Sequence, residues 1–265
     1  MSDDGLRSIQ SNSQPNELRN QGKRLPQYIA TASALLGALA GGSVLGWTGN
    51  ITEELEKDGF NNIKIDSSEI KWIGSCATLG AMAMCFPTGF LCEKLGRKLA
   101  ILVLAVMFIA GWLFIIFANS VSMIYVGRII TGMASGAFLP ASAVYLSELV
   151  EKEIRGGLVT IGGCLPLGIM LTYILGFALN PKLYTIVLAV ISVLFLIAFL
   201  FQPETPIYSM KRGEEEKARL TLIRMRGDSY DVDAELREIK AAIENDKKSK
   251  ISFRDSLRKR STRRA

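Results

Sequence analysis

The chain has 265 residues, 49% of them hydrophobic and 21% charged, with a formal net charge of +6. It contains no histidine, which removes the commonest zinc ligand and general base and argues against an intramembrane metalloprotease or a serine–histidine hydrolase. Its apolar stretches also contain no paired carboxylates, nucleophile–base set or metal-ligand cluster. We therefore expect no enzymatic activity, no metal site and no cofactor.

Six long apolar stretches, each with at most one charged residue, follow one another between residues 28 and 202. Because a helix rises ~1.5 Å per residue, about twenty residues cross the ~30 Å hydrocarbon core of a bilayer. The sequence therefore predicts an all-α integral membrane protein with a six-helix bundle over 28–202. The predicted membrane helices are 28–49, 72–92, 99–118, 122–147, 157–179 and 183–202.

A polar N-terminal tail, residues 1–27, precedes the first of these helices. We interpret 28–49 as a retained span, because a secretory signal has a shorter apolar core and a small-residue cleavage site. The positive-inside rule then orients the bundle, since 1–27, 93–98 and 148–156 together hold nine Lys or Arg. We expect both termini in the cytoplasm and the protein in the plasma membrane.

Residues 50–52, Asn-Ile-Thr, match an N-glycosylation site at Asn50 on the predicted outer side. The match lies directly after the first predicted helix, where the glycosylating enzyme has little room. An unused match is therefore at least as good an interpretation as a glycan.

Small residues and prolines divide the predicted helices into two groups. The first, fourth and fifth are rich in Gly, Ala and Ser, and Pro140 and Pro166 can bend a helix or loosen its hydrogen bonds. We expect these three to be packed or to line a cavity. The third and sixth, 99–118 and 183–202, are bulky all round and are expected to face lipid.

Two of the charged features between residues 28 and 202 need a physical explanation. The connection GFLCEKLGRK, residues 89–98, holds one acid and three bases, which a topology anchor alone would explain. Arg128 is the one charged residue inside a predicted span. An arginine at mid-membrane costs ~2.5–3.5 kcal/mol, so it needs a partner or water, or it snorkels to the outer surface. The sequence leaves both interpretations open.

Four motifs resemble those of the major facilitator superfamily and its sugar porter branch. GFLCEKLGRK resembles the G-x-x-x-D-R-x-G-R-[RK] signature between the second and third helices, and YVGRIITG (125–132) resembles G-R-x-x-x-G in the fourth. YLSELVEKEIRGG (145–157) and PETPIYSMKRGEEEKARLTLIRMRG (203–227) resemble two further sugar porter elements. KWIGS (71–75) is similar to the arthropod facilitated trehalose transporter-like members.

The resemblance implies a transmembrane sugar transporter that carries trehalose or a hexose by facilitated diffusion. In this family the sugar binds between two six-helix halves, and this chain corresponds to the N-terminal one. A set of cytoplasmic charges is expected to clamp one state of the transporter, with Arg97 meeting Glu148. The expected gating charges are Glu93, Lys94, Arg97, Lys98, Glu148, Arg155 and Glu204.

The same resemblance implies candidate residues for the substrate cavity. In the family an arginine at Arg128 faces the first helix, where proton-coupled members carry an aspartate, and LGWTGN (45–50) places Thr48 at that position. Thr48 does not titrate in the physiological range, so we expect no proton coupling, with a proton-coupled symporter as the alternative. Gly163 stands where hexose-selective members place a glutamine, and Pro166 follows it in the same helix.

Residues 203–250 are predicted to form a cytoplasmic helical domain. Within it, four apolar residues at spacings of four, three and four predict one amphipathic helix, capped by Asp231 or Asp233: Val232, Leu236, Ile239 and Ile243. Seventeen bases follow residue 203, without the aromatic interleaving that would indicate nucleic acid. Residues 251–265 are expected to approach a seventh helix, which is absent.

Three explanations account for a chain of six predicted helices where family members have twelve. It is a fragment of a longer transporter, a truncated isoform that assembles with a second copy or with the missing C-terminal half, or a non-transporting regulator or sensor with the same fold. The expected partners are the lipid bilayer and a small-molecule sugar, and no nucleic acid.

Overall fold

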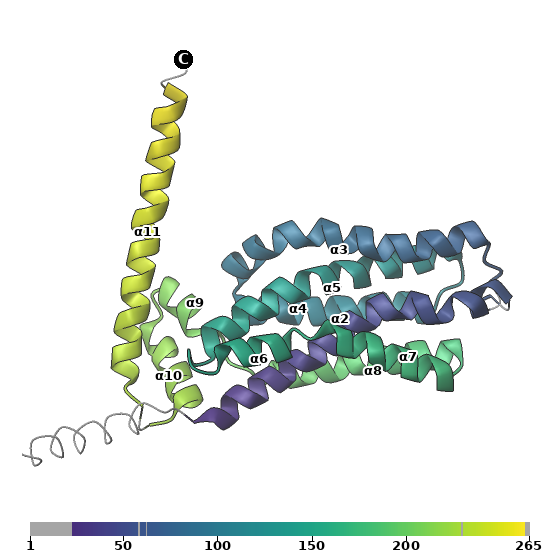
Figure 1. The fold of residues 1–265 in the computed structure, drawn as a ribbon, viewed down its shortest axis with the longest axis horizontal. Helices are drawn as coiled ribbons and strands as arrows, with labels where there is room; N and C mark the ends of the chain where they lie inside the picture. The colour runs from purple at the N-terminus through teal and green to yellow at the C-terminus, as the bar shows by residue number, and fades with distance from the viewer. Residues whose placement is uncertain (1–22, 58, 62, 229, 263–265) are drawn as a thin grey trace, which may run out of the picture. The chain divides into compact units, whose positions relative to one another are not determined.

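The computed structural model describes residues 23–57, 59–61, 63–228 and 230–262 (Figure 1). In these ranges the regular elements are α-helices, apart from an isolated antiparallel bridge between Phe60 and Ile63. The predicted all-α fold is confirmed. The chain divides into two compact units: Leu25–Glu204, and Thr205–Ala265 together with the N-terminal residues up to Arg24. The predicted N-terminal tail lies outside the described residues up to residue 22.

The first unit is a bundle of antiparallel helices. Six of its segments are long and apolar enough to cross a bilayer, with α6 and α7 together forming the fifth, and the six predicted membrane helices are thereby confirmed. The helices are α2 (Arg24–Lys57), α3 (Ser67–Leu95), α4 (Arg97–Ile116), α5 (Val121–Leu149), α6 (Arg155–Gly162), α7 (Leu165–Ala178) and α8 (Pro181–Leu200).

Several helices run past their predicted ends. α2 continues through the polar residues after Gly49 as far as Lys57, and α3 begins at Ser67 rather than at residue 72. The apolar pattern marks only the section that matches the hydrocarbon core. Outside that section water can solvate polar side chains, so a helix ends at its first strong breaker, such as Gly59 with φ +70°.

The fifth span is interrupted, whereas the other proline-containing spans are not. α6 ends at Gly162 and α7 begins at Leu165, just before Pro166. α3 and α5 run without a break through Pro87 and Pro140. A proline inside an apolar stretch therefore breaks only one of these three helices, a distinction that the sequence does not reveal.

Glycines allow the helix backbones of the bundle to approach closely. A Cβ atom at Gly132 of α5 would overlap the carbonyl oxygen of Ala77 in α3, and one at Gly42 of α2 would overlap the carbonyl oxygen of Leu165 in α7. Small residues at such contacts let van der Waals packing hold membrane helices together. The expectation that the first and fourth spans are packed agrees with this arrangement.

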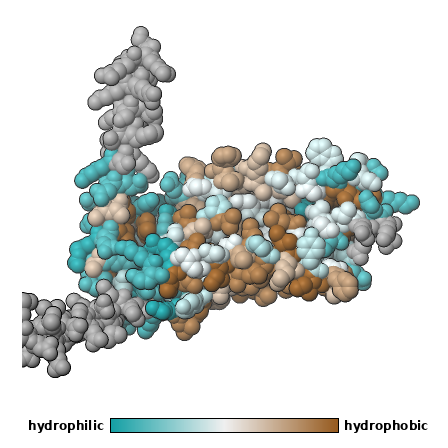
Figure 2. Space-filling model, in the orientation of Figure 1, coloured by the Kyte–Doolittle hydropathy of each residue, from teal (hydrophilic) through white to brown (hydrophobic). Residues whose placement is uncertain are grey.

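The expected division into helices that are packed or line a cavity and helices that face lipid is wrong for the third span. Half of the most apolar section of α4 is buried, because Leu104, Phe108 and Trp112 lie in the core between α5 and α8. The α6–α7 span is the least covered of the six, with 22% of its section buried. The size of its side chains alone therefore does not decide which face of a helix is buried by neighbouring helices. Figure 2 shows apolar side chains, in brown, along the flank of the bundle.

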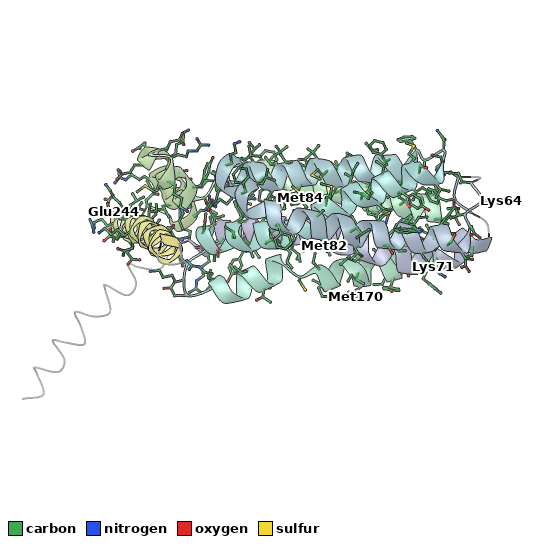
Figure 3. All side chains as sticks on the ribbon, turned by 90° about the horizontal axis from the view of Figure 1, so that it is seen from above. Lys64, Lys71, Met82, Met84, Met170 and Glu244 are labelled. Carbon is green, nitrogen blue, oxygen red and sulfur yellow. The ribbon has the colours of Figure 1, made fainter. Side chains whose placement is uncertain are left out.

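The loop between α2 and α3 is fastened to the end of α4. The Asn61 side-chain amide donates hydrogen bonds to the carbonyl oxygens of Ile116 (2.9 Å) and Ala118 (3.3 Å). Asn61 has φ 52°, a left-handed conformation that asparagine tolerates better than most residues. The neighbouring Phe60 packs edge-on against Trp47. Lys64 and Lys71 mark this end of the bundle in Figure 3.

The described residues of the second unit form three helices around a small apolar core. They are α9 (Pro206–Lys211), α10 (Glu215–Arg226) and α11 (Val232–Thr262). The core contains Ala218, Leu222, Val232 and Leu236, with Ile239 packed against it. The predicted amphipathic stripe is therefore confirmed for its first three residues, while Ile243 is half-buried. Asp231 is the cap, because its carboxylate accepts the Ala234 amide hydrogen at 3.0 Å.

Candidate functional site

An ion pair joins α4 and α5 at the end of the bundle opposite Lys64. Arg97 is the first residue of α4 and Glu148 lies in the last turn of α5. Glu148 Oε1 accepts hydrogen bonds from Arg97 Nη2 at 2.8 Å and Nε at 3.2 Å, and the side chains are 5% and 11% exposed. Gly96, with φ 102°, forms the one-residue turn that places Arg97 there. The structure thus brings together the two residues that we expected to meet.

Glu204 binds the start of α4 through the main chain. Its carboxylate accepts the amide hydrogens of Arg97 and Lys98, each at 3.1 Å. The first N–H groups of a helix have no partner within the helix and form the positive end of its dipole. Glu204 therefore acts as a charged cap of α4. The sequence predicts Glu204 as one member of a network of charged side chains. It gives no sign that the Glu204 carboxylate binds main-chain amides.

Uncharged polar residues tie the same end of the bundle together, and the sequence analysis missed them. The Gln27 side-chain oxygen accepts the Glu151 amide hydrogen at 2.9 Å, and the Gln202 amide donates to the Ser33 hydroxyl at 2.9 Å. The Tyr145 hydroxyl donates to the Pro203 carbonyl at 2.9 Å. The available signal was the position of Gln27 and Gln202 at the ends of apolar stretches, where a buried amide needs a partner.

Three of the other expected gating charges, Arg155, Lys94 and Glu93, have different surroundings from Arg97. Arg155 Nη2 donates to the Val150 carbonyl at the end of α5 at 3.3 Å, and Arg155 makes no ion pair among the described residues. Lys94 lies over the Phe90 ring, 5.6 Å from its centroid. Glu93 is exposed and makes no ion pair or hydrogen bond within the described part of the chain. The compact site is therefore Arg97, Glu148 and Glu204.

A second buried charge lies inside α5. The Arg128 side chain points into the bundle and is only 1% exposed, so it does not snorkel to the surface. It donates to the Val44 carbonyl at 2.9 Å, the Thr48 hydroxyl at 2.7 Å and the Ile73 carbonyl at 3.3 Å. Its guanidinium also lies 5.1 Å from the Trp47 ring centroid. Arg128 thereby links α5 to α2 and α3.

The ligands of Arg128 are all neutral. No carboxylate contacts it among the residues that the structure describes. Two carbonyl dipoles, one hydroxyl and an aromatic face replace the water that a guanidinium would otherwise bind. The site therefore holds a fixed positive charge but offers no acidic group at Thr48 to take up a proton.

The other three predicted residues, Gly163, Pro166 and Asn50, are not among the residues that bind Arg128. Gly163 directly follows α6, and a Cβ atom added to it would lie beside Leu139 and Val159. Pro166 is exposed at the start of α7. Asn50 lies inside α2 with its amide nitrogen buried. A buried amide within a helix is poorly presented for glycan attachment, which favours an unused match at Asn50.

Six apolar helices of membrane-spanning length define a multi-pass membrane protein, and comparison with known proteins gives its class. Residues 8–265 match the family described as "Sugar (and other) transporter". The facilitated trehalose transporter Tret1 of Polypedilum vanderplanki is 33% identical over 218 residues, covering 80% of this chain and 42% of that protein. The facilitated trehalose transporter Tret1-2 homolog of Drosophila simulans is 34% identical over 218 residues, covering 80% and 44%.

Solved structures share the fold. The partially occluded, inward-open xylose transporter XylE from E. coli has a TM-score of 0.72 and 21% identity, covering 83% of this chain and 59% of that one. The proton:xylose symporter XylE bound to 6-bromo-6-deoxy-D-glucose has a TM-score of 0.75 and 21% identity, covering 84% and 54%. The chain belongs to the sugar transporter family and has the fold of the N-terminal half of such a transporter. The relatives are transporters, not enzymes, and the chain spans less than half the length of the two trehalose transporters.

Proposed function

We propose that this chain forms the N-terminal half of a sugar transporter that carries trehalose or a hexose by alternating access. The observation that carries the proposal is the buried Arg97–Glu148 pair, with Glu204 on the first turn of α4. These contacts join two membrane helices and the chain segment after α8 at one end of the bundle. The names of the trehalose transporter relatives support the substrate class.

In this proposal the charge site clamps one state of the transporter. An exposed ion pair contributes roughly 0–1 kcal/mol, too little to control a conformational equilibrium. Breaking a buried pair by removing one partner costs about 3–5 kcal/mol. If this end of the bundle opens, water reaches Arg97, Glu148 and the Glu204 cap together. A change of a few kcal/mol is enough to move a two-state balance from one side to the other.

We further propose that transport is not coupled to protons. Arg128 binds the Thr48 hydroxyl, so the described residues offer no titratable partner at this position. Transport then follows the sugar gradient alone. The Arg97 end of the bundle is proposed to face the cytoplasm at the plasma membrane. The stretches 1–27, 93–98 and 148–156, which the sequence assigns to this side, hold nine Lys or Arg, against four assigned to the other side: Lys57, Lys64, Lys71 and Lys182.

Uptake measurements test the proposal. This chain is expressed in oocytes alone, and also as a chimera continued by the C-terminal half of Polypedilum vanderplanki Tret1. We expect saturable uptake of labelled trehalose or glucose by at least one of the two, without intracellular acidification when sugar is added. Correctly inserted protein that takes up neither sugar in either form would contradict the transport function, and acidification would contradict only the uncoupled mechanism.

A further inference from the structure

The last helix of the second unit continues far beyond the helices that it packs against. α11 has 31 residues, whereas α9 has six and α10 has twelve, and Figure 1 shows α11 extending past both. Its contacts with the small apolar core come from Val232, Leu236 and Ile239, all within its first three turns. Between residues 240 and 246 every position is exposed except Ile243, which is half-buried. The second half of α11 therefore begins where its packing against the core ends.

The charge of α11 changes sign at the same point. Residues 232–246 contain five acids and two bases, a formal charge of −3, whereas residues 247–262 contain seven bases and one acid, a formal charge of +6. The helix dipole favours basic residues, but only in the last turn of a helix. The basic stretch extends over about four turns, so the dipole does not explain it.

The basic residues of this half share a helical register. Four of them follow one another at spacings of three, four and four, which places them in one row along the helix: Lys247, Lys250, Arg254 and Arg258. Phe253 and Leu257, four residues apart, form an apolar row directly beside this basic row. A topology signal needs basic residues but no particular register. A basic row beside an apolar row is typical of a helix that lies in the surface of a membrane.

The membrane is a surface that the chain itself keeps close to α11. The second unit follows the span α8 directly, since α9 begins six residues after Leu200. Such a tether gives the membrane surface a high effective concentration, which a soluble partner does not have. The cytoplasmic leaflet is rich in anionic headgroups, and each Lys or Arg close to them strengthens binding about fivefold. Charge and tethering therefore favour the same partner.

We propose that the second half of α11, residues 247–262, binds the anionic lipid headgroups of the cytoplasmic leaflet. The basic row pairs with the phosphate and carboxylate groups of the lipids, and the apolar row enters the boundary between the headgroups and the acyl chains. This binding goes beyond the proposed transport function. It requires only that the second unit lies on the cytoplasmic side, and not that the chain carries sugar.

Amide hydrogen exchange on the full chain in lipid nanodiscs tests the proposal. Exchange over residues 247–262 is compared between discs of phosphatidylcholine alone and discs that also contain phosphatidylserine. A helix without a partner opens readily in water, whereas binding to a surface slows its exchange. With seven bases in the segment, we expect exchange to be at least about 10-fold slower in the anionic discs, and this difference to shrink at high salt. Exchange over residues 232–239 should be the same in both.

Two double variants separate the basic row from the rest of the helix. Lys250→Glu with Arg254→Glu reverses two charges of the row and should bring exchange in the anionic discs close to that in the neutral ones. Arg237→Glu with Lys240→Glu reverses two exposed bases of the first half and should leave the lipid effect unchanged. Each variant is compared with itself in the two kinds of disc, so a change in helix stability alone cancels.

Three outcomes would overturn the inference. The first is equal exchange in neutral and anionic discs, and the second is slowing by phosphatidylserine that persists when Lys250 and Arg254 are reversed. The third is slowing in neutral discs by soluble polyglutamate or inorganic phosphate with no effect of phosphatidylserine, which would assign the basic row to a soluble acidic partner. Absence of sugar uptake would contradict the proposed function and leave lipid binding intact.

Discussion

Two arginines are buried in the same helical bundle, and the chain compensates their charges in different ways. Arg97 meets a carboxylate, Glu148, at the end of two helices. Arg128 lies inside α5 and is held by two carbonyls and a hydroxyl. An ion pair at a helix end can separate when water reaches both partners. The ligands of Arg128 belong to α2 and α3 themselves, so they move with the bundle.

The comparison teaches that a buried charge can form either a breakable contact or a permanent joint. The two partners at Arg97 separate into water together when this end opens, whereas removing one of them leaves an uncompensated charge in the protein, at a cost of about 3–5 kcal/mol. The neutral groups around Arg128 belong to the same bundle, so none of them separates from Arg128 when the end of the bundle opens. We therefore propose conformational control for the first site and helix positioning for the second, and the following changes test that distinction.

The largest effect is expected for Glu148→Ala. It leaves the Arg97 guanidinium buried without its carboxylate, so the free energy of unfolding in detergent should fall by about 3–5 kcal/mol. Glu93→Ala is the control, because Glu93 is an exposed acid near the same helix end. Thermal unfolding followed by circular dichroism compares the two. Equal stability of the two variants would show that the pair is not the strong contact that its burial indicates.

Removing the cap of α4 should have an intermediate effect. Glu204→Ala leaves the Arg97 and Lys98 amides without their acceptor, and loss of a helix cap costs about 0.5–2 kcal/mol. Glu204→Gln should recover part of this loss, since its amide oxygen can still accept from one N–H. The same unfolding measurement applies, and a glutamine variant as unstable as the alanine variant would show that the negative charge, not the hydrogen bond, is essential.

Arg128→Met should change stability less than Glu148→Ala does. Methionine removes the three hydrogen bonds but also removes a charge that costs ~2.5–3.5 kcal/mol to place in a membrane, so we expect a net change within about 1.5 kcal/mol. The two carbonyls that lose the guanidinium donor, those of Val44 and Ile73, lie within helices α2 and α3. A loss as large as that of Glu148→Ala would show that the neutral shell stabilises Arg128 as strongly as an ion pair.

The smallest effect concerns Asp66, an exposed acid just before α3. Hydrogen bonds from the Ser68 hydroxyl, and then from the Ser67 and Ser68 amides, lower its pKa below 3.8. A lowered folded-state pKa gives stability that is present above the ordinary value and is lost as the pH falls through the folded value. The unfolding temperature should therefore be flat above about pH 5 and decline slightly below pH 4. Asp66→Asn should remove this part of the decline, and an unchanged acid profile would contradict the contribution.

Several site residues were predictable only in part. The resemblance to sugar porters predicts the contact between Arg97 and Glu148, because each residue stands in one of the family's cytoplasmic motifs. It did not indicate that Glu204 binds amides, or that Arg155 binds the Val150 carbonyl. These contacts depend on the angle at which a chain leaves its helix, and motif spacing contains no information about that angle.

The sequence by itself determined the number and positions of the membrane helices, because bilayer thickness is a one-dimensional constraint that twenty apolar residues satisfy in any surroundings. Only the tertiary structure decided which face of α4 is buried, which of three prolines breaks its helix, and which neutral groups surround Arg128. Those outcomes depend on which atoms of neighbouring helices lie next to each residue. Neighbours in space come from distant parts of the chain, so no local pattern specifies them.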